Sequence, residues 1–351
     1  MFFYRRYSVL LIFITCFLLS SCGGAKRELV SPKKTPQKPI PLWSAVTENS
    51  TLGCEVKLTD LQKISLFELI GQMLKKEVFS KSEVSYDEIV KEVGFDLFSE
   101  ISDIFITDMI IDNQKRYVVL GRFKKETDLL EIIAKFMLMA IGRHDMEKLK
   151  KHEIFGRKAI TALDESASMV QVDSLTVALI EGGERNAKYW LDQTFKMNQK
   201  RNYIINILSE LSKDEILGGR QASISAYADL GYKKFYLPIK DEFDWGYMKE
   251  VSLILSTEKD VFAVMETEYR DEQSAQKFEE EIRGFFNNPP PILSIFSEQL
   301  SKVKKNLKVK VNGKKVRTGT VIPEDVLETL YVTLKMFSDS KGFENLSIEN
   351  Q

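Results

Sequence analysis

Apolar residues along the chain change between the two-residue spacing of strands and the 3.6-residue spacing of helices, in an order that occurs twice. Each copy begins with two strand-like runs followed by an amphipathic helix. The expected ranges are 102–111, 116–123 and 126–141 in the first copy, and 251–257, 261–270 and 271–286 in the second. Positions 146 residues apart match in kind, as Val118 does with Val264 and Phe123 with Tyr269. Duplication and chance similarity both explain these matches, and the pattern slightly favours duplication.

Each copy continues with further strands and one more helix. In the second copy the strands flank Asn312-Gly313, a pair typical of two-residue hairpin turns. The expected ranges are 158–163, 169–172, 176–180 and helix 184–196 in the first copy, then 307–311, 316–322 and helix 323–337 in the second. The pattern therefore predicts an α+β protein whose antiparallel sheets pack with helices, in two similar β-β-α-β-β-α halves.

Other segments complete the domain organisation. Helices are expected over 58–79 and 85–92, with a helix over 203–211 and a strand over 221–230 between the halves. The expected divisions are a signal peptide (1–21), a lipidated cysteine with a Pro/Lys-rich tether (22–45), a first half (46–218), a second half (219–340) and a tail (341–351).

The N-terminus has the layout of a secretory signal. Arg5 and Arg6 precede an apolar run, Val9–Leu19, which is 11 residues long. A helix that crosses a bilayer needs about 20 residues, so a permanent membrane span is the weaker interpretation.

The apolar run ends in Leu19-Ser20-Ser21-Cys22-Gly23, which resembles the lipobox of bacterial lipoproteins. The resemblance implies cleavage between Ser21 and Cys22 and a diacylglyceryl thioether on Cys22, with acyl chains such as palmitate. An ordinary secretory signal, in which Cys22 is incidental, is the alternative. In this family Gly23, rather than Asp, after the cysteine goes with sorting to the outer membrane, where the body faces the periplasm. The remaining chain loosely resembles uncharacterised envelope proteins with repeated strand-strand-helix units, including a Gly94-Phe95-Asp96 segment before the first strand.

The stretch after the cysteine contains four of the nine prolines of the chain and five basic residues. Proline-rich chains favour extended polyproline II, so this stretch is expected to act as a spacer. Its basic residues could also contact anionic head groups. A solvated linker is the favoured interpretation.

The net charge and the number of cysteines argue against nucleic-acid binding and against an internal disulfide. Without residues 1–21 the chain has 48 basic and 51 acidic residues, a net charge of −3. That balance argues against a general nucleic-acid binder. Cys16 leaves with the signal and Cys22 becomes a thioether, so Cys54 is left without a disulfide partner. We expect Cys54 to be a buried structural thiol.

Residues for catalysis or metal binding are scarce. His144 and His152 are the two histidines, and their spacing fits no zinc site or helical pair. No nucleophile elbow, phosphate loop or dinucleotide fingerprint occurs in the sequence. The sequence therefore predicts no enzyme, no metal and no cofactor.

A basic stretch, residues 302–317, contains eight Lys and Arg residues and no acid. With a turn at Asn312-Gly313, Val309 would pair with Val316, Lys310 with Lys315 and Lys308 with Arg317. Like charges directly opposite one another destabilise a hairpin, so something must offset them. Internal acids within 266–281, or solvation, are the favoured explanation. An anionic partner at Lys308, Lys310, Lys315 and Arg317, such as lipid head groups, a surface polysaccharide or an acidic protein, is the alternative.

Three function classes remain. A non-enzymatic envelope protein that binds another protein or assists an assembly is the leading prediction, with the membrane, through Cys22, as its first partner. The alternative is a binder or carrier of an apolar or anionic ligand in a groove between the halves. An enzyme ranks third.

Overall fold

The computed structural model describes residues 39–65, 67, 85–126, 128–140, 149–194, 196, 198–236, 244–288 and 296–339. The chain forms an α+β protein, as the sequence predicts. The described residues cluster into two compact units that divide the chain at 62/63, 69/70 and 203/204. The division between the halves that the sequence pattern predicts is later, at 218/219.

In its described residues, the first unit contains an N-terminal 3-10 turn, seven strands and several helices. Its N-terminal elements are η1 (Leu42–Ala45), β1 (Leu52–Lys57), α2 (Leu58–Leu61), α4 (Tyr86–Val93) and α5 (Leu97–Glu100). These are followed by β2 (Ile101–Ile111), β3 (Gln114–Phe123), α6 (Leu129–Ala140), β4 (Leu149–Ile154), β5 (Arg157–Ala162), β6 (Ala167–Gln171), β7 (Thr176–Glu181) and α7 (Glu184–Thr194). Helix α8 (Gln199–Leu211) crosses the division between the units.

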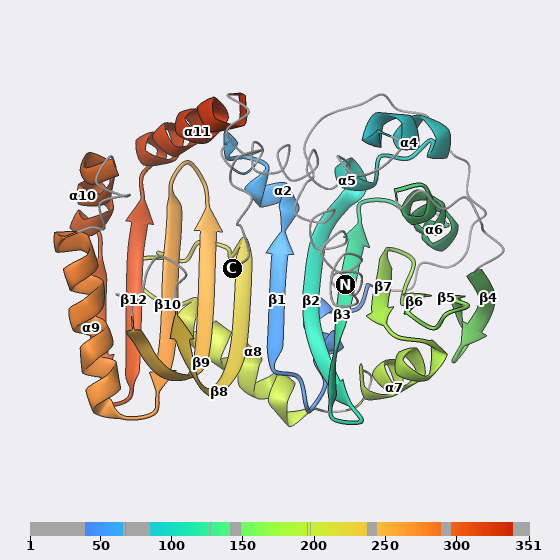
Figure 1. The fold of residues 1–351 in the computed structure, drawn as a ribbon, viewed down its shortest axis with the longest axis horizontal. Coiled ribbons are helices and arrows are strands. Elements are labelled where there is room, and N and C mark those ends of the chain that lie inside the picture. Colours follow the sequence, from blue (N-terminus) through green and yellow to red (C-terminus); the bar gives the residue numbers. More distant parts are fainter. Residues whose placement is uncertain are drawn as a thin grey trace, which may run out of the picture. The chain divides into compact units, whose positions relative to one another are not determined.

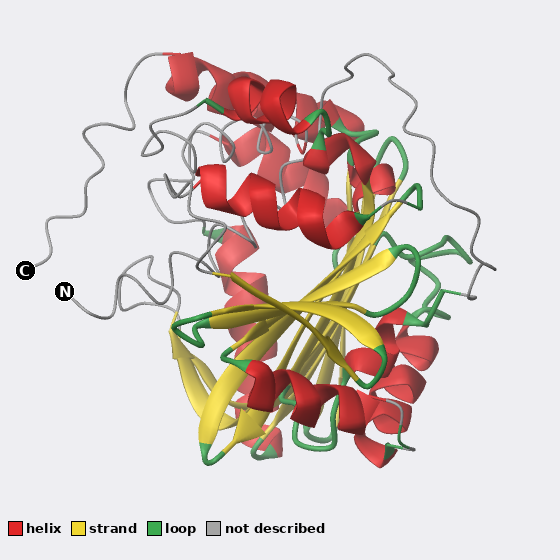
Figure 2. Ribbon diagram, turned by 90° about the vertical axis from the view of Figure 1, so that its right-hand side faces the viewer, coloured by secondary structure: helices red, strands yellow, loops and turns green. Residues whose placement is uncertain are grey.

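The strands of the first unit are antiparallel and follow the order β1-β2-β3-β7-β6-β5-β4 (Figure 1). Val118, Val119 and Leu120 are consecutive residues of β3, and each is fully buried. Consecutive side chains of a strand point to opposite faces, so both faces of this sheet are covered. Figure 2 shows helices on both sides of the strands.

The second unit contains five antiparallel strands in the order β11-β12-β10-β9-β8. Its elements are β8 (Ile224–Tyr236), β9 (Asp244–Thr257), β10 (Val261–Tyr269), α9 (Glu272–Asn287), α10 (Ser297–Lys305), β11 (Lys308–Asn312), β12 (Lys315–Ile322) and α11 (Glu324–Asp339). Helix α9 begins after Asp271, whose carboxylate accepts the Ser274 amide at 2.7 Å. Its inner side buries Ala275 and Phe278 against Tyr269, at 5.4 Å between the Tyr269 and Phe278 rings.

The two units share one strand order. The path β1-β2-β3-β7-β6 in the first unit corresponds, in sequence order and in pairing, to β8-β9-β10-β12-β11 in the second. A helix follows the third strand in both cases, α6 after β3 and α9 after β10. The residues matched in the sequence occupy equivalent core positions: Val118 and Val264 are fully buried, and Phe123 and Tyr269 are buried at the ends of those strands.

The structure corrects the expected halves in two places. After α6 the first unit has four strands, β4 to β7, and the second unit inserts α10 between α9 and β11. Strand β4 lies at the edge of its sheet and carries Lys150, Lys151 and Glu153, so charge hides its alternation, as is common for edge strands.

The expected N-terminal helices have different outcomes. The helix expected over 85–92 is confirmed by α4, which begins with a capping box between Ser85 and Glu88. The helix expected over 58–79 begins as expected with α2, but a turn at Gln62 and Lys63 interrupts it after Leu61. Most of its remaining length lies outside the described residues.

Candidate functional site

The predicted lipidation and cleavage residues, Ser21 and Cys22, lie outside the described residues. The predicted tether, 22–45, is too long, because residues 40–45 belong to the first unit. The Ile40 amide donates to Asp173 Oδ2 at 3.0 Å, and the Arg122 guanidinium donates to the Ile40 carbonyl oxygen. Leu42 and Ala45 are buried, because this segment supplies apolar side chains to the core.

The segment after Ile40 is held by hydrogen bonds from distant parts of the first unit. Trp190 is fully buried and its indole N–H donates to the Ala45 carbonyl oxygen at 3.1 Å. The Asn198 amide donates to the Val46 carbonyl oxygen at 2.7 Å. Arg201 Nη2 donates to Ser44 O at 2.6 Å. Three side chains from the α7–α8 region therefore fix the backbone where the N-terminal stretch joins the body.

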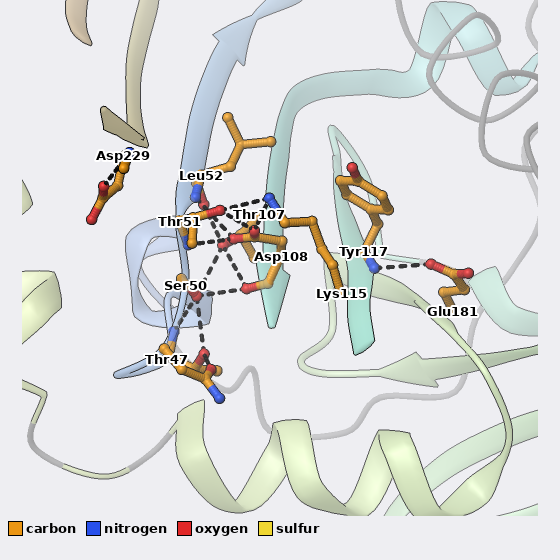
Figure 3. A network of polar contacts seen from close by, with 12 residues as sticks. Thr47, Ser50, Thr51, Leu52, Thr107, Asp108, Lys115, Tyr117, Glu181 and Asp229 are labelled. Atoms are coloured by element: carbon orange, nitrogen blue, oxygen red, sulfur yellow. Dashed lines mark hydrogen bonds and ion pairs between the residues drawn. The ribbon is translucent and has the colours of Figure 1, made fainter. Parts of the chain in front are cut away.

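A buried carboxylate, Asp108 on β2, fixes the next residues (Figure 3). It accepts the Thr51 amide at 2.7 Å and the Leu52 amide at 2.9 Å, and it forms an ion pair with Lys115 at 3.0 Å. The Ser50 hydroxyl donates to the Asp108 carbonyl oxygen at 2.6 Å. Because these contacts satisfy a fully buried charge, the network has a structural role in this segment.

The basic stretch forms the β11–β12 hairpin, with a different turn from the expected one. Asn312 pairs with Lys315, Val311 with Val316 and Lys310 with Arg317, so the turn is Gly313-Lys314. Gly313 has a φ of +59°, which a two-residue turn with glycine first requires. The expected turn at Asn312-Gly313 is therefore wrong by one residue, although a like-charge pair remains.

Acidic residues of the same unit form ion pairs with the basic residues of this hairpin and offset their charge. Glu266, on the neighbouring strand β10, accepts from Arg317 Nη2 at 2.6 Å and from Lys315 Nζ at 3.0 Å. Glu215 lies 3.1 Å from Lys308 Nζ and 3.3 Å from Lys310 Nζ. The favoured explanation, acids within 266–281, is thus confirmed for Lys315 and Arg317, whereas Lys308 and Lys310 pair with an acid outside that range. Glu266 is among the acids that the sequence pattern indicates, whereas Glu215 is far away in the chain and carries no local signal.

The ion pairs shift the acids toward their charged forms. Burial raises the pKa of Glu266, but hydrogen bonds from Arg317 and Lys315 outweigh it, so the pKa of Glu266 lies below its ordinary value. Hydrogen bonds from Lys308 and Lys310 lower the pKa of Glu215. The alternative, an anionic partner at Lys308, Lys310, Lys315 and Arg317, stays a prediction. Such a partner would have to compete with these acids.

The other candidate groups have structural contacts. His152 lies on β4, with Nε2 2.8 Å from Thr161 Oγ1 and Nδ1 3.5 Å from Glu184 Oε2, which confirms a partly packed histidine. His144 lies outside the described residues. Cys54 is half-buried rather than fully buried as predicted, because it lies at an intermediate exposure on β1. Partial burial, then the charge of Glu55, raises the pKa of its thiol to about 11, so it is protonated at neutral pH.

Two negative findings apply to the described ranges. They contain no group of three or more His, Cys, Asp and Glu side chains that could hold a metal ion. Their helices are all too short or too polar to cross a bilayer.

Comparisons with known proteins give no family. No protein-family model and no curated protein matches this sequence. Solved structures of TP0453 resemble the chain: crystal form I has a TM-score of 0.40 at 8% identity, over 86% of this chain and 99% of that one. Crystal form III has a TM-score of 0.43 at 10% identity, over 84% and 99%. These low values carry no inference about activity.

Proposed function

We propose that this chain is a lipoprotein of the bacterial cell envelope, anchored through acyl groups on Cys22, and that it binds envelope components rather than catalysing a reaction. The observation that carries the proposal is the order of Arg5 and Arg6, the 11-residue apolar run Val9–Leu19 and the Ser20-Ser21-Cys22 segment. Two or three acyl chains meet the two-signal requirement for stable anchoring. Where the host has two membranes, Gly23 favours the outer one.

The junction of the first unit supports an anchored body. Within the described part of the chain, the first contact with the body is at Ile40, and 17 residues separate it from Cys22 in the sequence. At about 3.3–3.6 Å per residue this length spans at most about 60 Å. A spacer of this length lets the body lie at the bilayer surface or up to that distance from it, while the contacts of Ile40 with Asp173 and Arg122 fix its point of attachment.

The non-enzymatic part of the proposal is supported by the contacts of the candidate reactive groups. Glu266 is bound by Arg317 and Lys315, and the Cys54 thiol is protonated at neutral pH. His152 lies against Thr161 and Glu184. Each group therefore has a structural account that requires no substrate.

The anchor is tested by labelling cells with a radioactive fatty acid and partitioning the tagged protein between detergent and water. We expect Cys22→Ser to lose the label and the detergent partitioning. Cys16→Ala is the matched control, since it removes a thiol from the same leader and should behave as wild type. Retention of label and partitioning by Cys22→Ser would refute lipidation at this cysteine.

The binding role is tested by crosslinking in intact cells, followed by purification in mild detergent. A stoichiometric envelope protein is the expected companion. A stoichiometric apolar or anionic small molecule would instead support the alternative, a ligand carried between the halves, which stays a prediction.

A further inference from the structure

The β4–β5 hairpin of the first unit ends in an unusual turn. Ile154 pairs with Arg157, so the turn is Phe155-Gly156, with φ values of +49° and +72°. Such turns favour Asn, Asp and Gly, because a side chain like that of Phe is strained at positive φ. The β2–β3 turn of the same sheet, Asp112-Asn113, has the expected residue types at φ values of +51° and +59°.

The Phe155 side chain is also exposed to solvent. At 65% relative exposure it exceeds every other large apolar residue in the described part of the chain. Neither backbone preference nor core packing explains a phenylalanine here. An observed backbone outlier of this kind points to a function of the exposed ring.

The turn lies close to the point where the N-terminal stretch joins the body. Ala159 of β5 pairs with Val170 of β6, so the antiparallel strands β5 and β6 have the Phe155-Gly156 turn and residue 172 beyond the same end. The next residue, Asp173, accepts the amide of Ile40 at 3.0 Å. Neighbouring strands are about 4.8 Å apart, so the Phe155-Gly156 turn and the point of attachment lie at the same end of two adjacent strands.

The chemistry around Phe155 fits a lipid surface. The hairpin residues 149–158 include four Lys and Arg residues and one acid, Glu153. Lys158 and Lys151 have half-exposed side chains that pair with Asp128 and Glu131 at the surface. Exposed pairs of this kind are weak and can exchange with anionic head groups. Amphipathic segments that lie in the membrane interface likewise combine Trp, Phe or Leu with Lys and Arg.

We propose that the Phe155-Gly156 turn inserts into the head-group region of the membrane that holds the acyl groups of Cys22. The inference rests on the proposed function, because the anchor keeps the turn close to the bilayer. A tethered contact forms at high effective concentration, so one ring is sufficient. A specific protein interface needs roughly 1,000 Å² or more, far beyond one exposed ring.

The test uses the lipidated protein, purified from membranes and reconstituted in vesicles of phosphatidylethanolamine and phosphatidylglycerol. Phe155→Cys is labelled with an environment-sensitive maleimide, and Leu163→Cys is the matched control. Leu163 is 62% exposed and lies just beyond the other end of β5. The native Cys54 thiol, with a pKa of about 11, is protonated at neutral pH and reacts slowly.

A lipid carrying a spin label in its acyl chain then quenches the probe. We expect quenching at position 155 to exceed that at 163 at least about twofold, because interfacial groups sit about 5–10 Å deep. Equal quenching at the two positions overturns the inference. Shielding of position 155 in native membranes, without quenching in pure lipid vesicles, assigns the turn to a protein partner and also overturns it.

Hydrogen exchange of the unlabelled lipidated protein gives a measurement without the cysteine. For each turn, the amide exchange rate of the lipidated protein in vesicles is compared with that of the unacylated protein. Exchange at the Phe155-Gly156 turn should slow several-fold more than exchange at the Asp112-Asn113 turn. Phe155→Asn, which suits the turn, should remove the difference.

The mass of the N-terminal peptide separates the two proposals. Acylated Cys22 without turn protection refutes only this inference, whereas unmodified Cys22 refutes the proposed function.

Discussion

Replacement of Glu266 by Gln tests whether the basic hairpin is stabilised from within the second unit. Glu266 accepts from Arg317 Nε at 3.0 Å and Nη2 at 2.6 Å, and from Lys315 Nζ at 3.0 Å. Its side chain is only 15% exposed. Gln keeps the size and one acceptor oxygen but removes the charge that offsets two bases.

The expected loss follows from burial. A hydrogen bond to a charged group contributes about 1.5–3 kcal/mol, whereas an exposed ion pair contributes about 0.2–1 kcal/mol. Glu266 lies between these cases and retains partial solvation, so we expect Glu266→Gln to lower the free energy of unfolding by about 1–3 kcal/mol. Glu210→Gln is the matched control. This change breaks the ion pair between Glu210, whose side chain is 68% exposed, and Lys213. It should lower the free energy of unfolding by less than about 0.5 kcal/mol.

Urea denaturation of the mature, unacylated chain measures both changes through the shift of the midpoint. The result that would refute the reasoning is a Glu266→Gln variant as stable as Glu210→Gln. The hairpin bases would then be stabilised by solvent rather than by Glu266.

The contribution of Glu266 to the free energy of unfolding should also depend on pH. The pKa of Glu266 lies below its ordinary value of 4.5, so its stabilisation is present above that value and is lost as the pH falls through the folded-state pKa. The stability gap between wild type and Glu266→Gln should therefore close in acid. A gap that stays constant from neutral pH into acid contradicts this assignment.

Three further predictions concern other positions. Gly319→Ala should lower stability by about 1–3 kcal/mol, because its Cβ would lie 2.4 Å from Ile216 Cδ1, and adding Ile216→Val should recover part of the loss in thermal melts. Phe155→Asn should raise stability by about 1 kcal/mol by relieving the positive φ, and an unchanged or lower melting temperature would argue against strain. Alkylation of Cys54 should be slow at neutral pH and accelerate toward pH 11, and rapid neutral alkylation in the folded state would contradict its raised pKa.

The strands and helices with strong periodicity were predictable from the sequence. The helix expected over 271–286 corresponds to α9 (Glu272–Asn287), because Ala275 and Phe278 lie on one apolar side behind the cap of Asp271. The shared strand order of the two units adds a pairing pattern that no periodicity contains. It is the arrangement that duplication would produce.

Elements whose signal is masked by charge or shortness were not predictable. Strand β4 carries Lys150, Lys151 and Glu153 in adjacent or nearly adjacent positions, so neither strand nor helix spacing is visible. The folded part of the expected tether was missed for another reason. Its prolines indicate an extended chain, but burial of Leu42 and Ala45 depends on partners such as Trp190, which lies far along the sequence.

The basic residues of the hairpin and their acidic partner Glu266 were predictable from the sequence, but their partner Glu215 was not. The sequence showed that Lys308, Lys310, Lys315 and Arg317 need an offset, since like charges face one another in a hairpin. It identified Glu266 through the neighbouring acidic stretch. Glu215 could not be found, because its contact with Lys308 and Lys310 depends on the path of the chain after α8.

Mass spectrometry of the N-terminal peptide, after purification from membranes in mild detergent, tests the central claim most directly. The proposal predicts a peptide that begins at Cys22 and carries the mass of a diacylglyceryl group, with or without a further acyl chain. An unmodified peptide that retains residues 1–21, or one cleaved at another position, would contradict it.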